Sequence, residues 1–523
     1  MKKSEVMKYV KRKKRQISIQ KVPEYICSLY VLVLITVYML SFSQGGYTTI
    51  SEHKCRFFLW LSSIFVISMT LILVEFWLIQ LPAPDKGRTI LHNKIIPVCL
   101  FMYLLFSCLS GFLSEYPQAL LGGERHEGML TIALYVLSTL LLMWKFQPGR
   151  WMLPIFSLSI LLFCGLGIIQ LTGDNPFYLY PVGYNFYDAG IYYSGQYWST
   201  IGNTNICSAL LSVSSGVFAV AMIRKSSIVN GLYMLSMCLS IFSILELNAE
   251  AGIVAVMVGL LCMLPIVVIN WQMFCNTLKV FSGLSLAIAT SFAAEFYDGG
   301  LKWVFGKETA VLVMISLFVG IAGLTLQKSK SFSVISSQRL RTVLAMSVIS
   351  LIVSGLFILY FCEDLPVDFL NQAHELMHGN WNDEFGSHRI YIWKQVWELV
   401  WEAPLLGGGP DTLGQRGLIG FSRYSNELKR LITSSIDVAH NEYLNILVNQ
   451  GLLSLLPYLA AIGFSLYVWW KNADDDVVCI GGAALLFYCI HAFFGISMCM
   501  SAPCFWIALA VLNIKTNKKE RER

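Results

Sequence analysis

Long apolar segments separated by short polar ones make up most of this chain. The apolar runs hold about 17 to 23 residues, which is the length that a helix needs to cross roughly 30 Å of hydrocarbon. The pattern predicts an all-α polytopic integral membrane protein with about 12–14 transmembrane helices. The predicted runs lie near residues 25–43, 57–79, 95–113, 127–144, 152–172, 203–223, 227–246, 251–270, 279–296, 309–327, 342–361, 449–470, 477–495 and 498–514.

The longest polar interruption, residues 362–450, contains an amphipathic segment from Arg389 to Glu402. Its apolar residues recur at helical spacing, with charged and amide side chains on the opposite face. They are Ile390, Trp393, Trp397, Val400 and Trp401. Three tryptophans on one face are typical of a helix at the headgroup boundary, and Ala403-Pro404 is expected to end it. The sequence thus predicts one large outward-facing loop that carries an interfacial amphipathic helix.

Composition and charge agree with a membrane protein. Of 523 residues, 56% are hydrophobic and 13% are charged, which excludes an ordinary soluble domain, where about a quarter are charged. Lys and Arg favour cytoplasmic loops, and most of the 38 in this chain fall on one side when the helices alternate across the bilayer. This asymmetry predicts that both termini are cytoplasmic. The net charge of +6 then reflects topology and contact with membrane lipids, and nucleic acid is not an expected partner.

The chain divides by composition into five parts. A basic cytoplasmic tail, residues 1–24, precedes transmembrane helices 1–11 in residues 25–361. The extracytoplasmic loop 362–450 follows, and residues 451–514 form the C-terminal transmembrane helices. A second basic cytoplasmic tail, 515–523, ends the chain. Because residues 1–20 are polar, a cleavable signal peptide is not expected.

Few ionisable residues lie beside the apolar runs, and each is a candidate for function because a charge near hydrocarbon is costly unless it is paired or used. Arg125 follows two glycines before a helix, Arg389 opens the amphipathic helix, and His440 precedes the run at 449. Glu250 lies in a short outward turn. An arginine fork binds phosphate well, and a histidine can accept a proton near neutral pH. These residues predict an outward polar site.

Each candidate also has a structural alternative. An arginine beside a helix can anchor it at the interface, and His440 can simply begin a helix. Glu250 can pair with an arginine. Asn203 and Asn205 can cap the helix that follows them. The residues alone therefore indicate an outward polar site without fixing its chemistry.

A glycine-rich turn, Leu405–Pro410, follows the amphipathic helix. It is either a plain connection or a set of exposed N–H groups, including that of Gly408, able to receive phosphate oxygens. It is not a nucleotide-binding loop, because no GK[ST] follows. The 14 cysteines show no zinc-type spacing, so neither a metal site nor a cofactor is predicted.

The order of several motifs resembles the O-antigen ligase and polysaccharide polymerase superfamily. The strongest block begins with Arg389-Ile390-Tyr391-Ile392-Trp393 and continues through Pro404–Pro410. It ends with Ala439-His440-Asn441-Glu442-Tyr443-Leu444, which leads into Gly451-Leu452-Leu453. The ligase-related region covers about residues 240–460, and its specific part is 386–455. Weaker matches are Gly122 with Arg125–Gly128, Gly202–Asn205 and Ser501–Trp506.

The resemblance implies a membrane glycosyltransferase of bacterial cell-surface polysaccharide synthesis. Such enzymes move a glycan from a polyprenyl (undecaprenyl) diphosphate carrier to an acceptor hydroxyl on the outer face of the cytoplasmic (inner) membrane, without metal or nucleotide sugar. The acceptor is a glycan, lipid or protein. Arg125, Arg389 and His440 would be the catalytic residues, with the arginines on the diphosphate and the histidine assisting acceptor attack. The expected substrate-binding residues are Asn441, Asn203, Asn205, Glu250 and Gly408.

Three questions stay open at the level of sequence. Many relatives have a Ser-Arg pair where this chain has Asn248-Ala249-Glu250-Ala251-Gly252, so phosphate binding there would differ. A ligase and a polymerase share these motifs and differ in the acceptor. A lipid-linked sugar flippase or transporter is the alternative of another class, and it predicts charges along a path through the bilayer centre.

Overall fold

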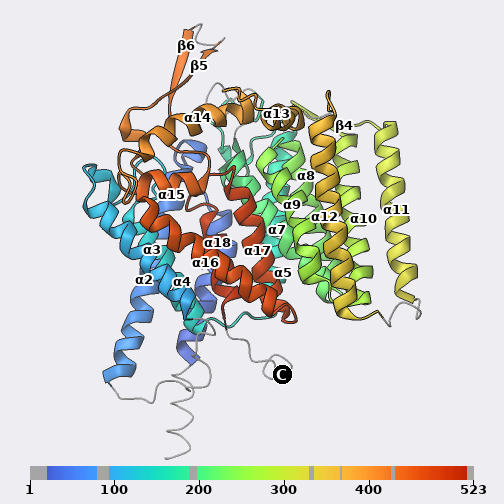
Figure 1. The fold of residues 1–523 in the computed structure, drawn as a ribbon, viewed down its shortest axis with the longest axis horizontal. Helices are drawn as coiled ribbons and strands as arrows, with labels where there is room; N and C mark the ends of the chain where they lie inside the picture. The colour runs from blue at the N-terminus through green and yellow to red at the C-terminus, as the bar shows by residue number, and fades with distance from the viewer. Residues whose placement is uncertain are drawn as a thin grey trace, which may run out of the picture.

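The computed structural model describes residues 21–78, 94–187, 197–328, 335–365, 368–425 and 430–514. Most helices stand side by side between two rims (Figure 1). The loop elements α13, α14 and the β5–β6 hairpin lie together at the upper rim. Nearly all of the two basic tails predicted from the sequence lies outside the described residues.

Ten helices within the described residues are long and apolar enough to cross a membrane, and four shorter apolar helices accompany them. Each corresponds to one of the apolar runs predicted from the sequence, so the all-α polytopic fold is confirmed. The ten are the first helix (Lys21–Tyr38, with the π turn η1, Leu34–Tyr38), α2 (Ile50–Leu78), α3 (Ile95–Phe112), α5 (Met152–Leu171), α7 (Thr204–Arg224), α9 (Glu250–Val267), α10 (Trp271–Ala293), α11 (Lys307–Lys328), α12 (Ser337–Phe361) and α16 (Leu452–Lys471). The four shorter ones are α4 (Met129–Lys145), α8 (Asn230–Glu246), α17 (Asp476–Ala492) and α18 (Ala502–Leu512).

Helix α7 is the centre of the bundle, and its apolar window is wholly buried. Its serines satisfy their hydroxyls locally: Ser212 donates to the Ala209 carbonyl at 3.0 Å and Ser215 to the Leu211 carbonyl at 2.8 Å. Small side chains let neighbouring helices approach closely in a membrane, where apolar burial alone does not drive association. Gly216 shows this directly, because a Cβ there would overlap the ring of Phe487 on α17. The serine-rich composition of α7 therefore reflects helix packing.

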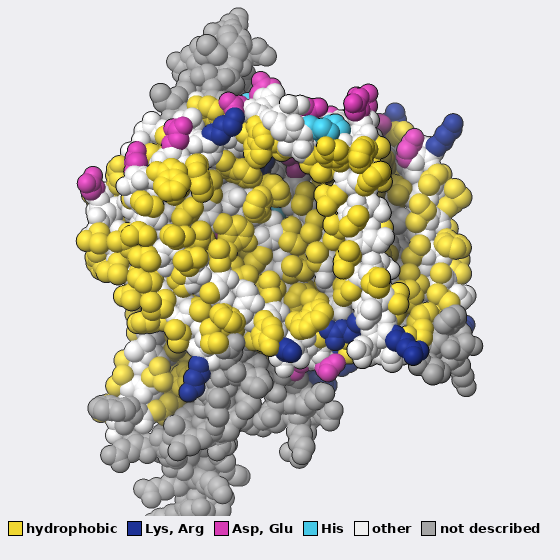
Figure 2. Space-filling view, in the orientation of Figure 1, with side chains coloured by type: hydrophobic (Ala, Val, Ile, Leu, Met, Phe, Trp, Pro, Cys, Tyr) yellow, Lys and Arg dark blue, Asp and Glu magenta, His cyan; other side chains and the backbone are white. Residues whose placement is uncertain are grey.

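The outer surface of the bundle carries a continuous apolar belt. Figure 2 shows this belt between an upper rim with Asp, Glu and His side chains and a lower rim where Lys and Arg predominate. Exposed apolar side chains along α12, such as Leu351, Val353 and Phe357, contribute to the belt. Such a surface matches hydrocarbon in the middle and headgroups at both rims. The chain is a multi-pass membrane protein.

Short elements that the sequence did not predict occupy the connections. Three two-stranded antiparallel hairpins occur in the described residues. They pair β1 (Tyr197–Trp198) with β2 (Gly202–Asn203), β3 (Ala294–Tyr297) with β4 (Gly300–Trp303), and β5 (Ile419–Ser425) with β6 (Arg430–Ser435). The remaining short helices are η2 (Gly46–Thr48), η3 (Pro117–Ala119), η4 (Pro176–Tyr178), α13 (Asp368–Met377), η5 (Leu413–Arg416) and α15 (Glu442–Gln450).

The predicted amphipathic helix exists as α14 (Phe385–Val400). Residues 386–388 have left-handed backbone angles, so the regular helix begins at Arg389 as the sequence indicated. Its buried stripe is Ile392, Val396 and Val400, which joins a small core with Leu413 and Val448. The predicted face is therefore only partly right, because Trp397 and Trp401 are exposed while Trp393 turns inward.

Candidate functional site

Three of the predicted residues meet at one place. Arg125 comes from the connection between α3 and α4, Arg389 from the start of α14, and His440 from the segment just before α15. Both guanidinium groups act electrostatically on the imidazole of His440. The fold thus brings together an arginine from the first third of the chain with two residues of the large loop.

His440 is held from both sides. Its own backbone is left-handed, with φ of 49°. The preceding Ala439 accepts a hydrogen bond from Trp393 Nε1 at 2.9 Å, and its N–H donates to Asn445 Oδ1 at 3.3 Å. The following Asn441 caps α15 by accepting the N–H of Leu444 at 3.1 Å. These bonds fix the imidazole at the junction of α14 and α15.

The surroundings keep His440 neutral. Burial lowers the pKa of His440 to about 4, and the charges of Arg389 and Arg125 lower it further, while Asp437 opposes them. A neutral imidazole has a free lone pair at pH 7 and can accept a proton. The ring therefore has the protonation state that a general base needs.

Arg125 is paired with an acid that the sequence reading missed. Its Nη2 lies 2.6 Å from Oδ2 of Asp437, and the two side chains are 25% and 16% exposed. The connection that carries Arg125 is docked on the large loop, because the Glu127 N–H donates to Asp411 Oδ2 at 3.2 Å. Arg125 is thus a fixed part of this site. The one sequence signal for Asp437 was its place three residues before His440.

Arg389 is oriented mainly by its own chain. Its Nη1 donates to the Gly386 carbonyl at 2.7 Å, within the left-handed stretch that precedes α14. Burial lowers the pKa of Arg389, and the carboxylate of Glu250 opposes this effect. An arginine nevertheless remains charged at any physiological pH. Glu250, at the start of α9, therefore acts electrostatically on Arg389.

The three asparagines have mainly structural contacts. Asn203 Oδ1 accepts the N–H groups of Asn205 at 3.0 Å and Ile206 at 3.3 Å, so it caps α7. Asn441 caps α15 in the same way. The Oδ1 of Asn205 is buried and has no hydrogen-bond partner among the described residues. Asn205 is thus the one of the three whose Oδ1 does not cap a helix in the described residues.

The expectation for Gly408 needs correction. Its N–H donates to the Val448 carbonyl at 3.2 Å and that of Gly409 to the Asn449 carbonyl at 2.7 Å, so neither is free for phosphate. Glycine is required at 407, where φ is 64° and a Cβ would overlap the backbone of Asn449, whereas a Cβ at 408 would meet the movable guanidinium of Arg416. The turn therefore clasps the C-terminal end of α15 and serves packing.

A polar cavity of about 470 Å³, including space open to solvent, lies beside the site. Glu442 in its wall accepts hydrogen bonds from Tyr458 at 2.5 Å and Tyr488 at 3.0 Å. Burial raises the pKa of Glu442 to about 7 and that of Asp411 to about 6, and it raises the pKa of Glu127 as well. The lining of the cavity also includes Asn445, Asn449, Gln450 and Ser497. Sequence reasoning missed this group of acids, although Glu442 stands within the quoted motif.

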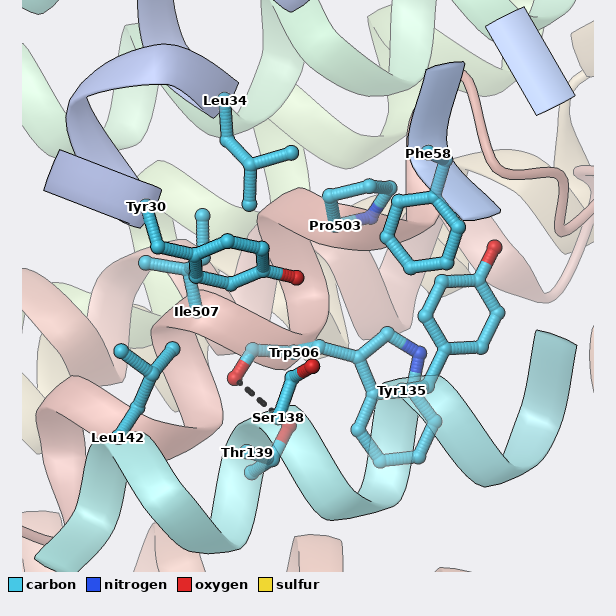
Figure 3. Close-up of a pocket in the computed structure, with 10 residues that line it drawn as sticks. All are labelled: Tyr30, Leu34, Phe58, Tyr135, Ser138, Thr139, Leu142, Pro503, Trp506 and Ile507. Carbon is cyan, nitrogen blue, oxygen red and sulfur yellow. Dashed lines mark hydrogen bonds between the residues drawn. The ribbon is translucent and has the colours of Figure 1, made fainter. Parts of the chain in front are cut away.

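A second cavity, of about 220 Å³, lies among the first helix, α2, α4 and α18 (Figure 3). Its lining is aliphatic and aromatic, with Ser138 and Thr139 as the only hydroxyls besides those of tyrosines. Thr139 donates to the Trp506 carbonyl at 3.4 Å, so that hydroxyl is already used. No charged side chain lines this cavity, which makes it unsuited to a sugar diphosphate.

The described residues contain no group of three or more His, Cys, Asp or Glu side chains that could hold a metal ion. The charged side chains that act electrostatically on His440 are instead two arginines and one aspartate. Convergent guanidinium groups are suited to an anion with several oxygens, such as a diphosphate.

Comparison with known proteins assigns this region to a family. Residues 306–459 match the family model described as O-antigen ligase, a segment that runs from the connection before α11 into α16. It includes Arg389, Asp437 and His440, whereas Arg125 and Glu250 lie outside it. No curated protein matches the chain. This segment of the chain is therefore similar to the O-antigen ligase family, and it holds two of the three converging residues.

Proposed function

We propose that this protein is a membrane glycosyltransferase of the O-antigen ligase type. It transfers a glycan from an undecaprenyl diphosphate carrier to an acceptor hydroxyl at the outer face of the bacterial cytoplasmic membrane, in the synthesis of cell-surface polysaccharide. The observation that carries the proposal is the convergence of Arg125 and Arg389 on a neutral His440, with two of the three inside the O-antigen ligase domain.

The geometry supports a division of labour between these residues. The leaving group is a diphosphate, which is stable once its negative charge is met by fixed cations. Arg389 and Arg125 supply those cations, and His440 accepts the proton of the acceptor hydroxyl as its oxygen attacks the anomeric carbon. Holding both substrates against one rigid junction contributes further, because the reaction then proceeds within one complex.

The position of the site supports a lipid-linked donor. The loop elements that carry Arg389 lie at one rim of the apolar belt (Figures 1 and 2). A polyprenyl tail can stay in hydrocarbon there while the acceptor approaches from water. The opposite rim is rich in Lys and Arg on the face shown, which supports placing that rim in the cytoplasm. This orientation puts the site outside and both termini inside.

The same arrangement argues against the flippase or transporter alternative. Transport would call for ionisable side chains along a path through the bilayer centre. The converging charges instead lie on connections and on α14, outside the spanning helices. A polymerase would use the same machinery with a carrier-linked glycan as acceptor, so the ligase assignment rests on the family description.

Replacement of His440 by alanine tests the proposed function. We expect His440→Ala to lower glycan transfer by about 10²- to 10⁴-fold, the usual contribution of a general base, with unchanged protein abundance in the membrane. Transfer is measured with purified protein and a lipid-diphosphate glycan donor. Asp383→Asn is the control, because its ion pair with Lys394 is exposed at the same loop. Full transfer by the His440 variant would reject the base assignment.

A further inference from the structure

Asp437 forms an ion pair with Arg125, one of the two arginines that are proposed to bind the donor. Its Oδ2 lies 2.6 Å from Arg125 Nη2, and both side chains are largely but not fully sheltered from water. Arg389, by contrast, donates to a backbone carbonyl and interacts electrostatically with Glu250. In this structure, the protein's own carboxylate therefore holds Arg125.

A carboxylate and a phosphate bind the guanidinium fork in the same way, through charge-assisted hydrogen bonds. Only one of them can occupy the same Nη2 atom of Arg125. A diphosphate carries more charge than one carboxylate and can reach both arginines at once. A diphosphate oxygen that takes Nη2 of Arg125 therefore displaces the Asp437 carboxylate from this contact.

Asp437 also acts on the base. It lies three residues before His440, and its charge favours the protonated imidazole, against burial and both arginines. Of the other ionisable groups near this junction, Glu250 acts electrostatically on Arg389, and Asp411 accepts the Glu127 N–H and acts on Arg125. His491 of α17 bonds to Ser208 at 2.8 Å, and Glu442 bonds to two tyrosines. Asp437 is therefore the carboxylate placed to respond when His440 gains a proton.

On the basis of the proposed glycosyl transfer, we propose that Asp437 is a positioning residue that exchanges partners. It holds Arg125 before the donor binds and, once a donor phosphate oxygen takes Nη2 of that guanidinium, it supports the imidazolium of His440. The exchange ties the strength of the base to the presence of the donor.

The charges balance through the reaction. The acceptor oxygen forms its bond to the anomeric carbon as the bond from that carbon to the diphosphate oxygen breaks, and the electron pair leaves with the diphosphate. The hydroxyl proton passes to His440. The site then holds one more positive charge on the ring and one more negative charge on the leaving group. Asp437 offsets the first, and Arg125 with Arg389 offsets the second.

The exchange predicts a pH signature in the unmodified protein. The fall of kcat/KM at acidic pH reports the pKa of His440 in the free enzyme. The fall of kcat at acidic pH reports the pKa of His440 in the donor complex. The diphosphate neutralises the arginines and releases Asp437, so His440 holds its proton more tightly in the complex. The kcat limb is therefore expected at higher pH than the kcat/KM limb. Coincident limbs would overturn the proposal without any variant.

Asp437→Asn provides the second arm. We expect undecaprenyl diphosphate, the carrier left after transfer, to bind this variant in nanodiscs about threefold to tenfold more tightly, because a competing carboxylate is gone. We expect kcat to fall about tenfold and its acidic limb to move to lower pH, because the protonated ring loses its support. Asp437→Glu keeps the charge and should keep the wild-type affinity and limb, and Asp383→Asn serves as the control.

The outcomes separate the two claims. Unchanged or weaker binding of undecaprenyl diphosphate to Asp437→Asn, or an unmoved kcat limb, overturns the exchange. Failure of the wild-type protein both to bind undecaprenyl diphosphate and to transfer glycan overturns the proposed function itself. Wild-type binding and transfer together with an unresponsive Asp437 variant reject the exchange alone.

Discussion

The two arginines of the site reach it from regions of different character. Arg389 lies on α14 inside the O-antigen ligase domain, and its guanidinium bonds to its own backbone. Arg125 lies outside that domain, on the connection between α3 and α4, and it is paired with Asp437 beside an acid-lined cavity. In the proposed function, Arg389 can thus receive a phosphate oxygen directly, whereas Nη2 of Arg125 must first release the carboxylate of Asp437. The comparison shows that equal charges in one site need not contribute equally to binding.

The largest effect is expected at Arg389. Arg389→Ala should lower kcat/KM for the lipid-diphosphate donor about hundredfold, because a partly buried cation with no strong internal competitor is lost. Arg389→Lys should recover only part of this loss, since an ammonium group lacks the planar fork. Steady-state kinetics over a range of donor concentrations measures both. Lys394→Ala, on the same helix, is the control because its ion pair is exposed. A smaller loss of kcat/KM in Arg389→Ala than in Arg125→Ala would contradict the greater importance expected for Arg389.

Arg125→Ala should cost less, about tenfold in kcat/KM for the donor, because part of the energy of Arg125 is already spent on Asp437. The variant also leaves the Asp437 carboxylate unpaired, so adding Asp437→Asn should restore part of the loss. A double-mutant cycle on donor kinetics then gives a coupling energy of about 1 kcal/mol. Strict additivity would show that the two residues do not influence each other during catalysis.

The smallest expected effect is on the pH dependence of stability, and it concerns Glu442 in the polar cavity. Burial raises the pKa of Glu442 to about 7, so the folded protein binds this proton more tightly than the unfolded chain. Its contribution to stability is present at low pH and is lost as pH rises toward and past 7, by about 1 kcal/mol between pH 6 and 8. Glu442→Gln should remove this dependence in thermal unfolding at the two pH values. Glu398→Gln, exposed on α14, is the control, and an equal dependence in wild type and Glu442→Gln would show that this carboxyl does not titrate between pH 6 and 8.

The sequence predicts the helices well because apolar length is a local property. The split between α8 and α9 falls at 247–249, between the apolar runs predicted at 227–246 and 251–270. Arg389 opens the regular part of α14 as expected, and the family motifs point to Arg389 and His440. These features depend on neighbours along the chain or on a short block of motif residues.

The features that were missed depend on contacts between distant segments. Asp437 acquires its meaning from Arg125, which stands far upstream, and the polar cavity joins residues of both regions. The left-handed residues before α14 and the β5–β6 hairpin follow from loop geometry that helical periodicity does not encode. Gly408 was misread because composition shows a glycine turn but not which carbonyls its N–H groups meet.

The hydrogen bonds between the glycine turn and the C-terminal end of α15 fix the position of this helix. Helix α15 has nine residues, a strut of about 13 Å, with the clasp at one end and His440 at the other. A side chain introduced at 407 would overlap the backbone of Asn449 at the C-terminal end of α15 and displace this helix with the imidazole, and a displacement of about 1 Å is enough to cost about a hundredfold in rate. The β5–β6 hairpin instead projects away from the bundle (Figure 1), so its length can change while the strut stays in place. Evolution is therefore free to lengthen the loop between the turn and the base, but not to thicken the turn.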